Sequence, residues 1–483
     1  MSTSTDIPEP LPEDEPNDVL FNSIYGVRAI ELNRPKKFNA LNGSMVRKIL
    51  PRLVVRDCPF EYVYLFCFSL RLGIYRLLNA FTLKKEYEKS QLANVIIVSG
   101  AGPKALCAGG DVAALALLNE KGPDGQRSST EYFAEEYKLD HLIATYSKPY
   151  ISVMDGVTMG GGVGLSVHAP FRIATERTLF AMPETSIGFF PEVGGSFFLP
   201  RLDGELGTYL ALTSERLKGV QALYAGIATH YLDSSILGNL TARLSELVFN
   251  DTATLPERLD LVNKTIWEYS TGLPPEPITP GGAVRSAIDR CFKYNTIEEI
   301  LEALKKETDQ EEWAKKTLET LSLRSPTSLK VTLRQQRLGK KWSIAEAFRR
   351  EHHIAGCFMR HPDFVQGVKS RLMTKPPVQA KWEPGSLSEV TADTVDSFLS
   401  IPDDAEHLSL LKDVDYNTYP HAKYALPSEK VIEKFVRDNS PSEEQIQAHF
   451  AQEWDNKEGV RQKVAEVLAR RTNKTEQGLR WVD

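Results

Sequence analysis

The residues VIIVSG at 95–100 form a strand-like run, and the glycine turn CAGGD at 107–111 follows before a helical run begins. The same form returns downstream, where YISVMDG at 150–156 leads to the glycines at 160–162 and an apolar run at 163–167. Each turn places glycine-rich backbone at the expected N-terminus of a helix, where free N–H groups and the helix dipole favour negative charge. Two such turns aimed at one point make an oxyanion hole, which stabilises charge that develops on a carbonyl oxygen.

Two carboxylates follow these turns. Glu184 comes directly after Met182 and Pro183 in an apolar context, and Glu192 lies in the run FPEVGG at 190–195. A carboxylate in apolar surroundings is costly unless it has a partner or a chemical role. Capping of the helix that follows is the alternative interpretation for Glu184. Together with the glycine turns, these acids indicate acyl or enolate chemistry.

The composition excludes several classes of protein. A chain of 483 residues is expected to form one to three domains. The formal net charge of -6 gives no electrostatic reason to expect DNA or a membrane as a partner. The five cysteines form no CxxC pair, which favours a reducing compartment. No apolar run reaches the roughly 18 residues that a membrane span needs.

Four regions follow one another along the chain. Residues 1–18 are acidic and proline-rich without Lys or Arg, so we expect a disordered leader and see no Arg-rich import signal in it. Strands alternate with helices in residues 19–250, which predicts an α/β core. Residues 251–375 are mostly helical in pattern, and two prolines at 376 and 377 mark a boundary. Residues 376–483 are predicted to form an additional helical extension.

The extension carries apolar stripes at helical spacing. Ile446, Phe450 and Trp454 recur every fourth residue, and a second stripe is formed by Val460, Val464, Val467 and Leu468. We expect both stripes to pack on the parent domain. Docking onto a partner or a neighbouring subunit is the alternative.

Residues 54–83 interrupt what would otherwise be one amphipathic helix. The segment is rich in aromatic residues and leucine, and the part from 62 to 68 carries no charge. It is either a buried hairpin specific to a lineage or the translation of a retained intron. We favour the intron, because removing the segment restores a continuous helix; an mRNA that encodes the segment would contradict this interpretation.

Other motifs favour ordinary structure. The run GAGPKA at 100–105 superficially matches a dinucleotide-binding fingerprint, but Pro103 and the next turn leave no helix where the pyrophosphate needs one. His353, Cys357 and His361 share a helical face, yet the last precedes a proline and no fourth zinc ligand is evident. We therefore expect packing at these residues and no metal site.

Seven motifs together resemble the crotonase (enoyl-CoA hydratase/isomerase) superfamily, and within it the fungal members of the 3-hydroxyisobutyryl-CoA hydrolases. They are NRPK at 33–36, CAGGD at 107–111, MGGGVG at 159–164, MPE at 182–184, FPEVG at 190–194, SPTSL at 325–329 and HPDF at 361–364. The resemblance covers residues 19–375 apart from 54–83. It implies an α/β spiral of ββα repeats with C-terminal helices over the acyl site, which in the family sometimes mediate homo-oligomers.

The resemblance also implies roles for individual residues. The carbonyl oxygen of an acyl-CoA thioester would lie between the N–H groups of Gly110 and Gly161. Glu184 matches the catalytic carboxylate, which either attacks the thioester or activates water. Glu136 matches a substrate-binding acid, and Glu192 stands where the family usually has Asp, in contact with the 3-hydroxyl group or assisting proton transfer.

The segment from Lys36 to Ala40 resembles the loop that cradles the CoA nucleotide. Because coenzyme A is part of the substrate, the resemblance implies no separate cofactor. The extra methylene of Glu192 matters most, since a displacement of about an ångström in a catalytic site can cost orders of magnitude in rate.

Three functions compete. The first is hydrolysis of 3-hydroxyisobutyryl-CoA or related 3-hydroxyacyl-CoA thioesters in valine breakdown, in the mitochondrial matrix. The second is hydration or isomerisation of an enoyl-CoA with the same hole. The third is a structural role, because fungal proteins resembling this one are also subunits of the mitochondrial small ribosomal subunit, with the extension as a docking element.

Overall fold

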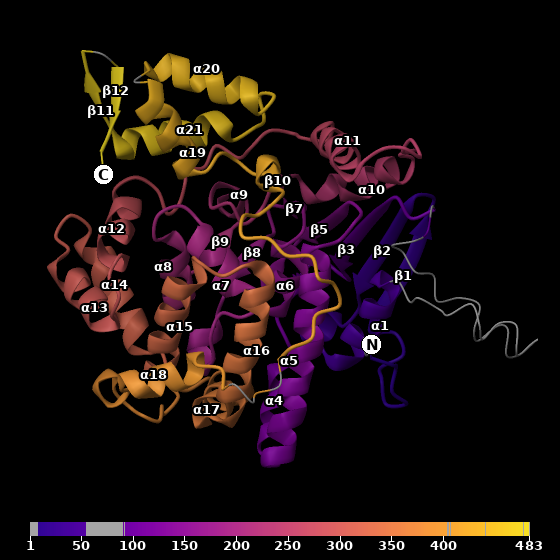
Figure 1. Ribbon diagram of the computed structural model, residues 1–483, viewed down its shortest axis with the longest axis vertical. Coiled ribbons are helices and arrows are strands. Elements are labelled where there is room, and N and C mark those ends of the chain that lie inside the picture. Colours follow the sequence, from indigo (N-terminus) through magenta and orange to yellow (C-terminus); the bar gives the residue numbers. More distant parts are fainter. Residues whose placement is uncertain are drawn as a thin grey trace, which may run out of the picture.

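The structure is a computed structural model that describes residues 8–54, 90, 92–402, 405, 407–439, 441–476 and 478–482. Figure 1 shows a central sheet region, helices packed around it, and the helices and hairpin that follow residue 428 gathered on one side. Apart from Val54, the interruption predicted at 54–83 lies outside the described residues. Both interpretations of it therefore stay predictions.

The main sheet has six strands in the order β1-β2-β3-β5-β7-β10. The strands are β1 (Val19–Ile24), β2 (Val27–Leu32), β3 (Val95–Gly100), β5 (Tyr150–Met154), β7 (Phe171–Ala174) and β10 (His230–Tyr231). β1 is antiparallel to β2, and the other neighbours are parallel. Parallel strands covered on both faces need continuous apolar sequences, which explains the runs at β3 and β5.

A second sheet of short strands lies beside the first. It runs in the order β4-β6-β8-β9, with β4 (Ala105–Cys107), β6 (Val157–Met159), β8 (Leu179–Ala181) and β9 (Leu217–Lys218). β4, β6 and β8 pair in parallel, and each follows a long strand of the main sheet. The predicted repeat of two strands and a helix is confirmed in β3-β4-α4 and β5-β6-α6.

Helices surround the two sheets (Figure 1). Those of the core are α1 (Gly43–Leu53), α4 (Val112–Asn119), α5 (Pro123–Ala144), α6 (Gly161–Val167), α7 (Gly195–Phe198), α8 (Leu206–Thr213), α9 (Val220–Tyr224), α10 (Leu237–Ser245) and α11 (Leu255–Trp267). The C-terminal helices are α12 (Gly282–Phe292), α13 (Ile297–Lys306), α14 (Glu311–Ser322), α15 (Pro326–Gly339), α16 (Ile344–Arg360) and α17 (Pro362–Val368). The helical region expected after the core is therefore present, and its longest helix, α16, packs along α5.

The extension contains α18 (Ala392–Leu399), α19 (Glu429–Asn439), α20 (Glu443–Glu453), α21 (Val460–Arg471) and the hairpin of β11 (Thr472–Thr475) and β12 (Gly478–Trp481). The hairpin corrects the expectation of a purely helical extension. The stripe on α21 is buried, as are Ile446 and Phe450 on α20. Both stripes thus pack within the chain. No helix in the described part of the chain is both long and apolar enough to cross a membrane.

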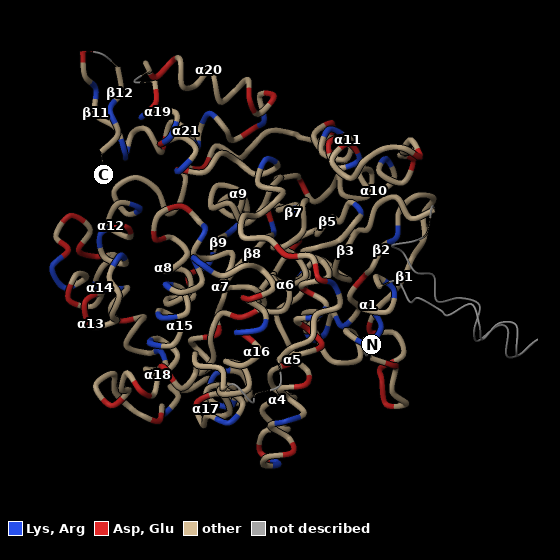
Figure 2. Tube along the Cα trace, in the orientation of Figure 1, with Lys and Arg blue, Asp and Glu red and all other residues tan. Residues whose placement is uncertain are grey.

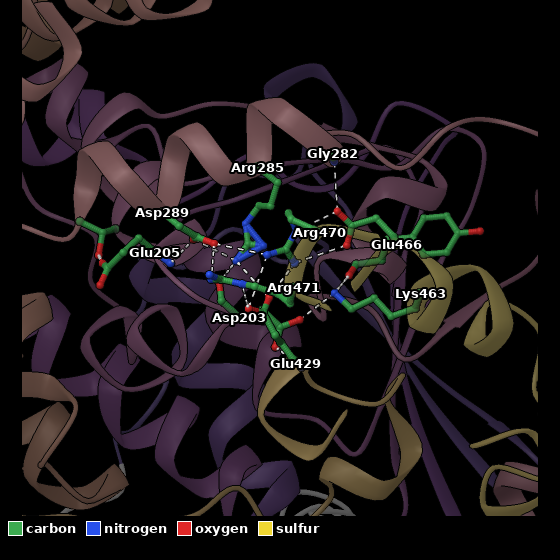
Figure 3. Close-up of polar contacts among 12 residues, drawn as sticks. Asp203, Glu205, Gly282, Arg285, Asp289, Glu429, Lys463, Glu466, Arg470 and Arg471 are labelled. Atoms are coloured by element: carbon green, nitrogen blue, oxygen red, sulfur yellow. Dashed lines mark hydrogen bonds and ion pairs between the residues drawn. The ribbon is translucent and has the colours of Figure 1, made fainter. Parts of the chain in front are cut away.

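A buried network of charges fastens the extension to the core (Figure 3). Lys463 Nζ lies 2.7 Å from Asp203 Oδ2, and Arg471 Nη2 lies 2.7 Å from Asp289 Oδ2 of α12. Arg470 binds Glu429 of α19 at 2.7 Å and its side chain is only 2% exposed. Figure 2 shows basic and acidic residues interspersed elsewhere over the described trace. The network therefore sets the position of α19 and α21 on the core through paired, buried charges.

The leader differs from the expectation of disorder. Residues 8–18 turn back onto α1, where Asp14 pairs with Arg47 and Lys48 Nζ lies 2.5 Å from Asp18 Oδ1. Glu15 Oε1 lies 3.1 Å from Arg34 Nη2. The expectation is wrong for residues 8–18, because their acids meet cations whose proximity the local composition does not show. Residues 1–7 lie outside the described ones.

The network predicts that the extension and the core unfold together. Arg470→Ala removes one guanidinium partner of buried Glu429 and leaves Arg471 as the other. The loss should therefore lie between the roughly 1 kcal/mol of an exposed pair and the roughly 3 kcal/mol of a buried charge left unpaired. We expect urea denaturation to show a loss of that size in the free energy of unfolding. The control, Arg127→Ala at a side chain that is 72% exposed, should change it by less than about 1 kcal/mol. Equal, small losses in both variants would contradict a structural role for the network.

Candidate active site

The two glycine turns meet. Leu41 N donates to Gly109 O at 2.8 Å and Asp111 N donates to Leu41 O at 2.7 Å, so the N–H of Gly110 takes no part in this bridge. Gly161 is the first residue of α6, where helix N–H groups lack partners within the helix. A Cβ atom on Gly161 would lie 3.4 Å from Gly110 N and only 2.4 Å from Glu136 Oε1. The turns predicted separately therefore converge, and a side chain at position 161 would displace the Glu136 carboxylate.

Three predicted carboxylates gather at this point. Glu136 comes from α5, Glu184 begins the 3₁₀ turn Glu184–Ile187 after β8, and Glu192 precedes α7. A Cβ atom on Gly160 would lie 3.2 Å from Glu184 Oε1. The three residues are at most 5% exposed, and each keeps one buried oxygen without a hydrogen-bond partner among the described residues. Because a buried polar atom is normally paired, these oxygens are available to a polar ligand.

Burial changes the acidity of these groups. It raises the pKa of Glu184 to about 8, and the carboxylate of Glu136 adds to this effect. It also raises the pKa of Glu136 to about 8, against a lowering by the hydrogen bond from Tyr132. The pKa of Glu192 rises through burial and through the charges of Glu136 and Glu184. Carboxyl groups that titrate near neutral pH can both hold and accept a proton, as general acid–base chemistry requires.

A cavity of about 490 Å³ lies beside the Gly110 turn. Its lining includes Leu41, Arg47, Asp111 and Tyr132. A Cβ atom on Gly110 would lie 3.3 Å from the Tyr132 hydroxyl, so the cavity borders the glycine turns. Leader residues Leu11 and Glu13 also line it. The described part of the leader therefore forms one wall of this cavity.

The predicted nucleotide loop lies next to the Gly110 turn. Lys36 is exposed in the turn Pro35–Lys37, and Ala40 O accepts a hydrogen bond from Arg34 Nη1 at 2.7 Å. Asn39, at φ 54°, donates to Ala105 O at 2.8 Å and ties the loop to β4. Arg34 also contacts Asp111 Oδ2 at 2.9 Å. The loop is thus fixed beside the Gly110 turn with basic side chains on it.

Sequence reasoning missed two further buried acids. Asp140 lies one helical turn after Glu136 on α5, and a Cβ atom on Gly164 would lie 2.5 Å from its Oδ2. Its spacing from Glu136 was a signal that could have identified it. Glu351 of α16 is fully buried and contacts the loop that follows Glu192. Only the fold brings it there, because 157 positions separate Glu351 from Gly194.

The histidines do not join the site as ligands. His361 Nδ1 accepts a hydrogen bond from Asp363 N at 3.3 Å and so caps α17, while His353 Nε2 lies 3.7 Å from Cys357 Sγ. His168 is buried at the end of α6, and its Nε2 lies 2.7 Å from Val193 O.

Val193 itself has φ 52°, a backbone conformation that costs on the order of 1–3 kcal/mol for a side chain branched at Cβ.

The two-layer spiral and the glycine turns with their acids are features of one class of enzymes that act on CoA thioesters. The family model for enoyl-CoA hydratase/isomerase matches residues 68–399, and the chain belongs to this family. It is 51% identical over 472 residues to the small ribosomal subunit protein mS47 of Neurospora crassa, covering 96% of this chain and 87% of that protein. It is 42% identical over 368 residues to the mitochondrial 3-hydroxyisobutyryl-CoA hydrolase of Xenopus laevis, covering 76% and 85%.

A solved structure has the same fold. A carnitinyl-CoA dehydratase from Mycobacterium thermoresistibile superposes with a TM-score of 0.65 at 30% identity, covering 82% of this chain and all of that one. The expected crotonase-like α/β fold is therefore confirmed.

The raised pKa of Glu184 predicts how stability depends on pH. Between its ordinary value of 4.5 and about 8, the folded protein binds a proton at Glu184 that the unfolded chain releases. The stability that the folded protein gains from the protonated Glu184 side chain is fully present below pH 4.5 and is lost as the pH rises to about 8. Since glutamine does not ionise, Glu184→Gln should gain stability relative to the unsubstituted protein by roughly 1–4 kcal/mol between pH 5 and 9. A difference in urea unfolding free energy that stays constant over that range would contradict the assignment.

Proposed function

We propose that this protein is a component of the small subunit of the mitochondrial ribosome, built on the scaffold of an acyl-CoA hydrolase. The likeness to the Neurospora protein carries the proposal. It covers 96% of the chain and so must include most of residues 376–483. The likeness to the hydrolases of Xenopus laevis and Danio rerio extends over 368 and 390 residues. The Neurospora protein thus matches more of this chain than either of these two hydrolases does.

The extension is suited to docking because it is rigid. Its apolar stripes are buried in its own chain, and Lys463, Arg470 and Arg471 hold it by buried ion pairs. A preorganised surface loses little conformational entropy when it binds. Lys434 and the hairpin residues Lys474 and Arg480 remain exposed on it. We call the surface of the extension that carries these three basic residues its outer face, and we propose that it contacts the ribosomal subunit.

Sedimentation tests this role. Deletion of the extension would also break the buried network, so substitutions on its surface are the sharper experiment. The unsubstituted protein should co-sediment with the mitochondrial small subunit, and the triple variant Lys434→Glu, Lys474→Glu and Arg480→Glu should shift most of it to the free fraction, because it reverses charge on the docking face. The matched control reverses Lys305, Lys315 and Lys316, which are exposed on α13 and α14, and should still co-sediment. Free migration of the unsubstituted protein would refute the proposal.

Hydrolysis of a short 3-hydroxyacyl-CoA thioester is the second candidate. The observation that favours it is the set of unpartnered carboxylate oxygens on Glu136, Glu184 and Glu192 beside the glycine turns. The thioester carbonyl oxygen would accept hydrogen bonds from the N–H groups of Gly110 and Gly161, which stabilise the negative charge of the tetrahedral intermediate. The two functions do not exclude each other, because the site and the outer face of the extension use different residues.

The proposed reaction gives Glu184 the central role. Its carboxylate either attacks the carbonyl carbon to form a mixed anhydride or takes a proton from the attacking water. In both routes the C–S bond breaks, the sulfur leaves as the thiolate of CoA and is protonated, and water supplies the oxygen of the free acid. Glu192 would contact the 3-hydroxyl group or assist proton transfer, and Glu136 would bind the substrate. The loop from Lys36 to Ala40 would hold the nucleotide of CoA.

Thiol release tests the reaction directly. Purified protein should release CoA from 3-hydroxyisobutyryl-CoA, and Glu184→Gln should lower kcat by at least about 100-fold, because the amide can neither attack nor accept a proton. Glu346→Gln, at a partly exposed acid of α16, serves as the control and should retain activity. Consumption of an enoyl-CoA without thiol release would favour hydration or isomerisation instead. Full activity of Glu184→Gln would refute the role of this residue.

A further inference from the structure

The loop that carries Glu192 is strained next to the site. Val193 has φ 52° and Gly194 has φ 80°, so two successive residues adopt the left-handed conformation. A residue branched at Cβ rarely adopts it, and such a conformation persists only where the surroundings impose it. The contacts that impose it here are therefore of functional interest.

Side chains from three separate elements hold this loop by its backbone. Gln335 Nε2 of α15 donates to Pro191 O at 3.3 Å, and His168 Nε2, at the end of α6, lies 2.7 Å from Val193 O. Glu351 of α16 accepts from Gly194 N at 2.7 Å through Oε2. These contacts fix the main chain on both sides of Glu192, whereas Glu192 Oε2 itself has no partner among the described residues.

Glu351 makes the largest contribution to this hold. Its Oε1 accepts from Ser196 N at 2.8 Å and from Ser196 Oγ at 2.5 Å, so both of its oxygens are used on the loop. The side chain is fully buried, where a carboxylate is costly unless its acceptors are satisfied. Glutamine in its place would present an NH₂ group to one of these donors. The chemistry of the loop therefore requires a carboxylate at this position.

We propose that Glu351 is a positioning residue: by holding Gly194 and Ser196 it keeps Val193 in the left-handed conformation and so aims the Glu192 carboxylate into the acyl site. This inference rests on the hydrolase activity proposed above. Relaxation of Val193 to negative φ would rotate the peptide that follows Glu192 and displace its side chain. A displacement of about 1 Å in a reacting group can cost about 100-fold in rate.

The decisive test combines Glu351→Gln with Val193→Gly. Glu351→Gln should lower kcat for thiol release by about 10- to 100-fold with KM within about threefold, because positioning rather than binding is lost. Glycine adopts positive φ without steric cost, so Val193→Gly should restore kcat at least about tenfold in the Glu351→Gln background. A residue that merely stabilised the fold would not be rescued by a glycine. Unchanged kcat in Glu351→Gln, or no rescue in the double variant, would overturn the proposal.

Two further measurements separate this inference from the activity itself. If the unsubstituted protein releases no thiol, the hydrolase proposal fails, and crystal structures of it and of Glu351→Gln decide the inference. Val193 should move to negative φ with a displaced Glu192 in the variant, and an unchanged loop would overturn it. If Glu351→Gln does not fold, Ser196→Ala removes only the hydroxyl contact. It should lower kcat severalfold at constant KM, and an unaltered kcat would refute the positioning role.

Discussion

The close contact between the glycine turns at Gly110 and Gly161 is the constraint on which the rest of the structure depends. It needs the parallel pairing of β3 with β5 and of β4 with β6, which brings the two turns to one place. A Cβ atom at position 161 would stand 2.4 Å from Glu136 Oε1 and 3.4 Å from the Gly110 nitrogen, so a side chain there would displace the Glu136 carboxylate. The buried acids, the cavity beside the Gly110 turn and the predicted nucleotide loop lie next to this contact.

Two groups of buried carboxylates in this chain have opposite surroundings. At the glycine turns, burial raises the pKa of Glu184 and Glu136, and the Glu136 carboxylate adds to the rise for Glu184. At the extension, burial also acts to raise the pKa of Glu429, but Arg470 outweighs it and the pKa is lowered. The first group is costly to fold and is understandable as a site for chemistry. The second is paired and serves to join the extension to the core. Buried glutamates thus support both proposed functions: those at the glycine turns support the hydrolysis, and Glu429 supports the docking of the extension.

What could be predicted from sequence depended on how local the signal was. The strand–turn–helix units around 95–111 and 150–167 are local patterns, and family motifs located Glu136, Glu184 and Glu192, which the fold brings together. The order of residues 8–18 depends on Arg34, Arg47 and Lys48, and the hold on Val193 depends on Glu351 and His168. Such contacts join residues far apart in the chain and leave no periodic pattern. The same holds for the ion pairs of Arg470 and Arg471, which local sequence does not reveal.

The most direct test is a cryo-EM structure of the mitochondrial small ribosomal subunit purified from cells that produce this chain and incubated with a thioether analogue of 3-hydroxyisobutyryl-CoA that keeps the carbonyl group. The account predicts the chain on the subunit with the outer face of its extension in contact. It also predicts the analogue's carbonyl oxygen about 3 Å from the nitrogens of both Gly110 and Gly161. A subunit that lacks this chain, or a bound analogue whose carbonyl lies away from the two glycines, would contradict it.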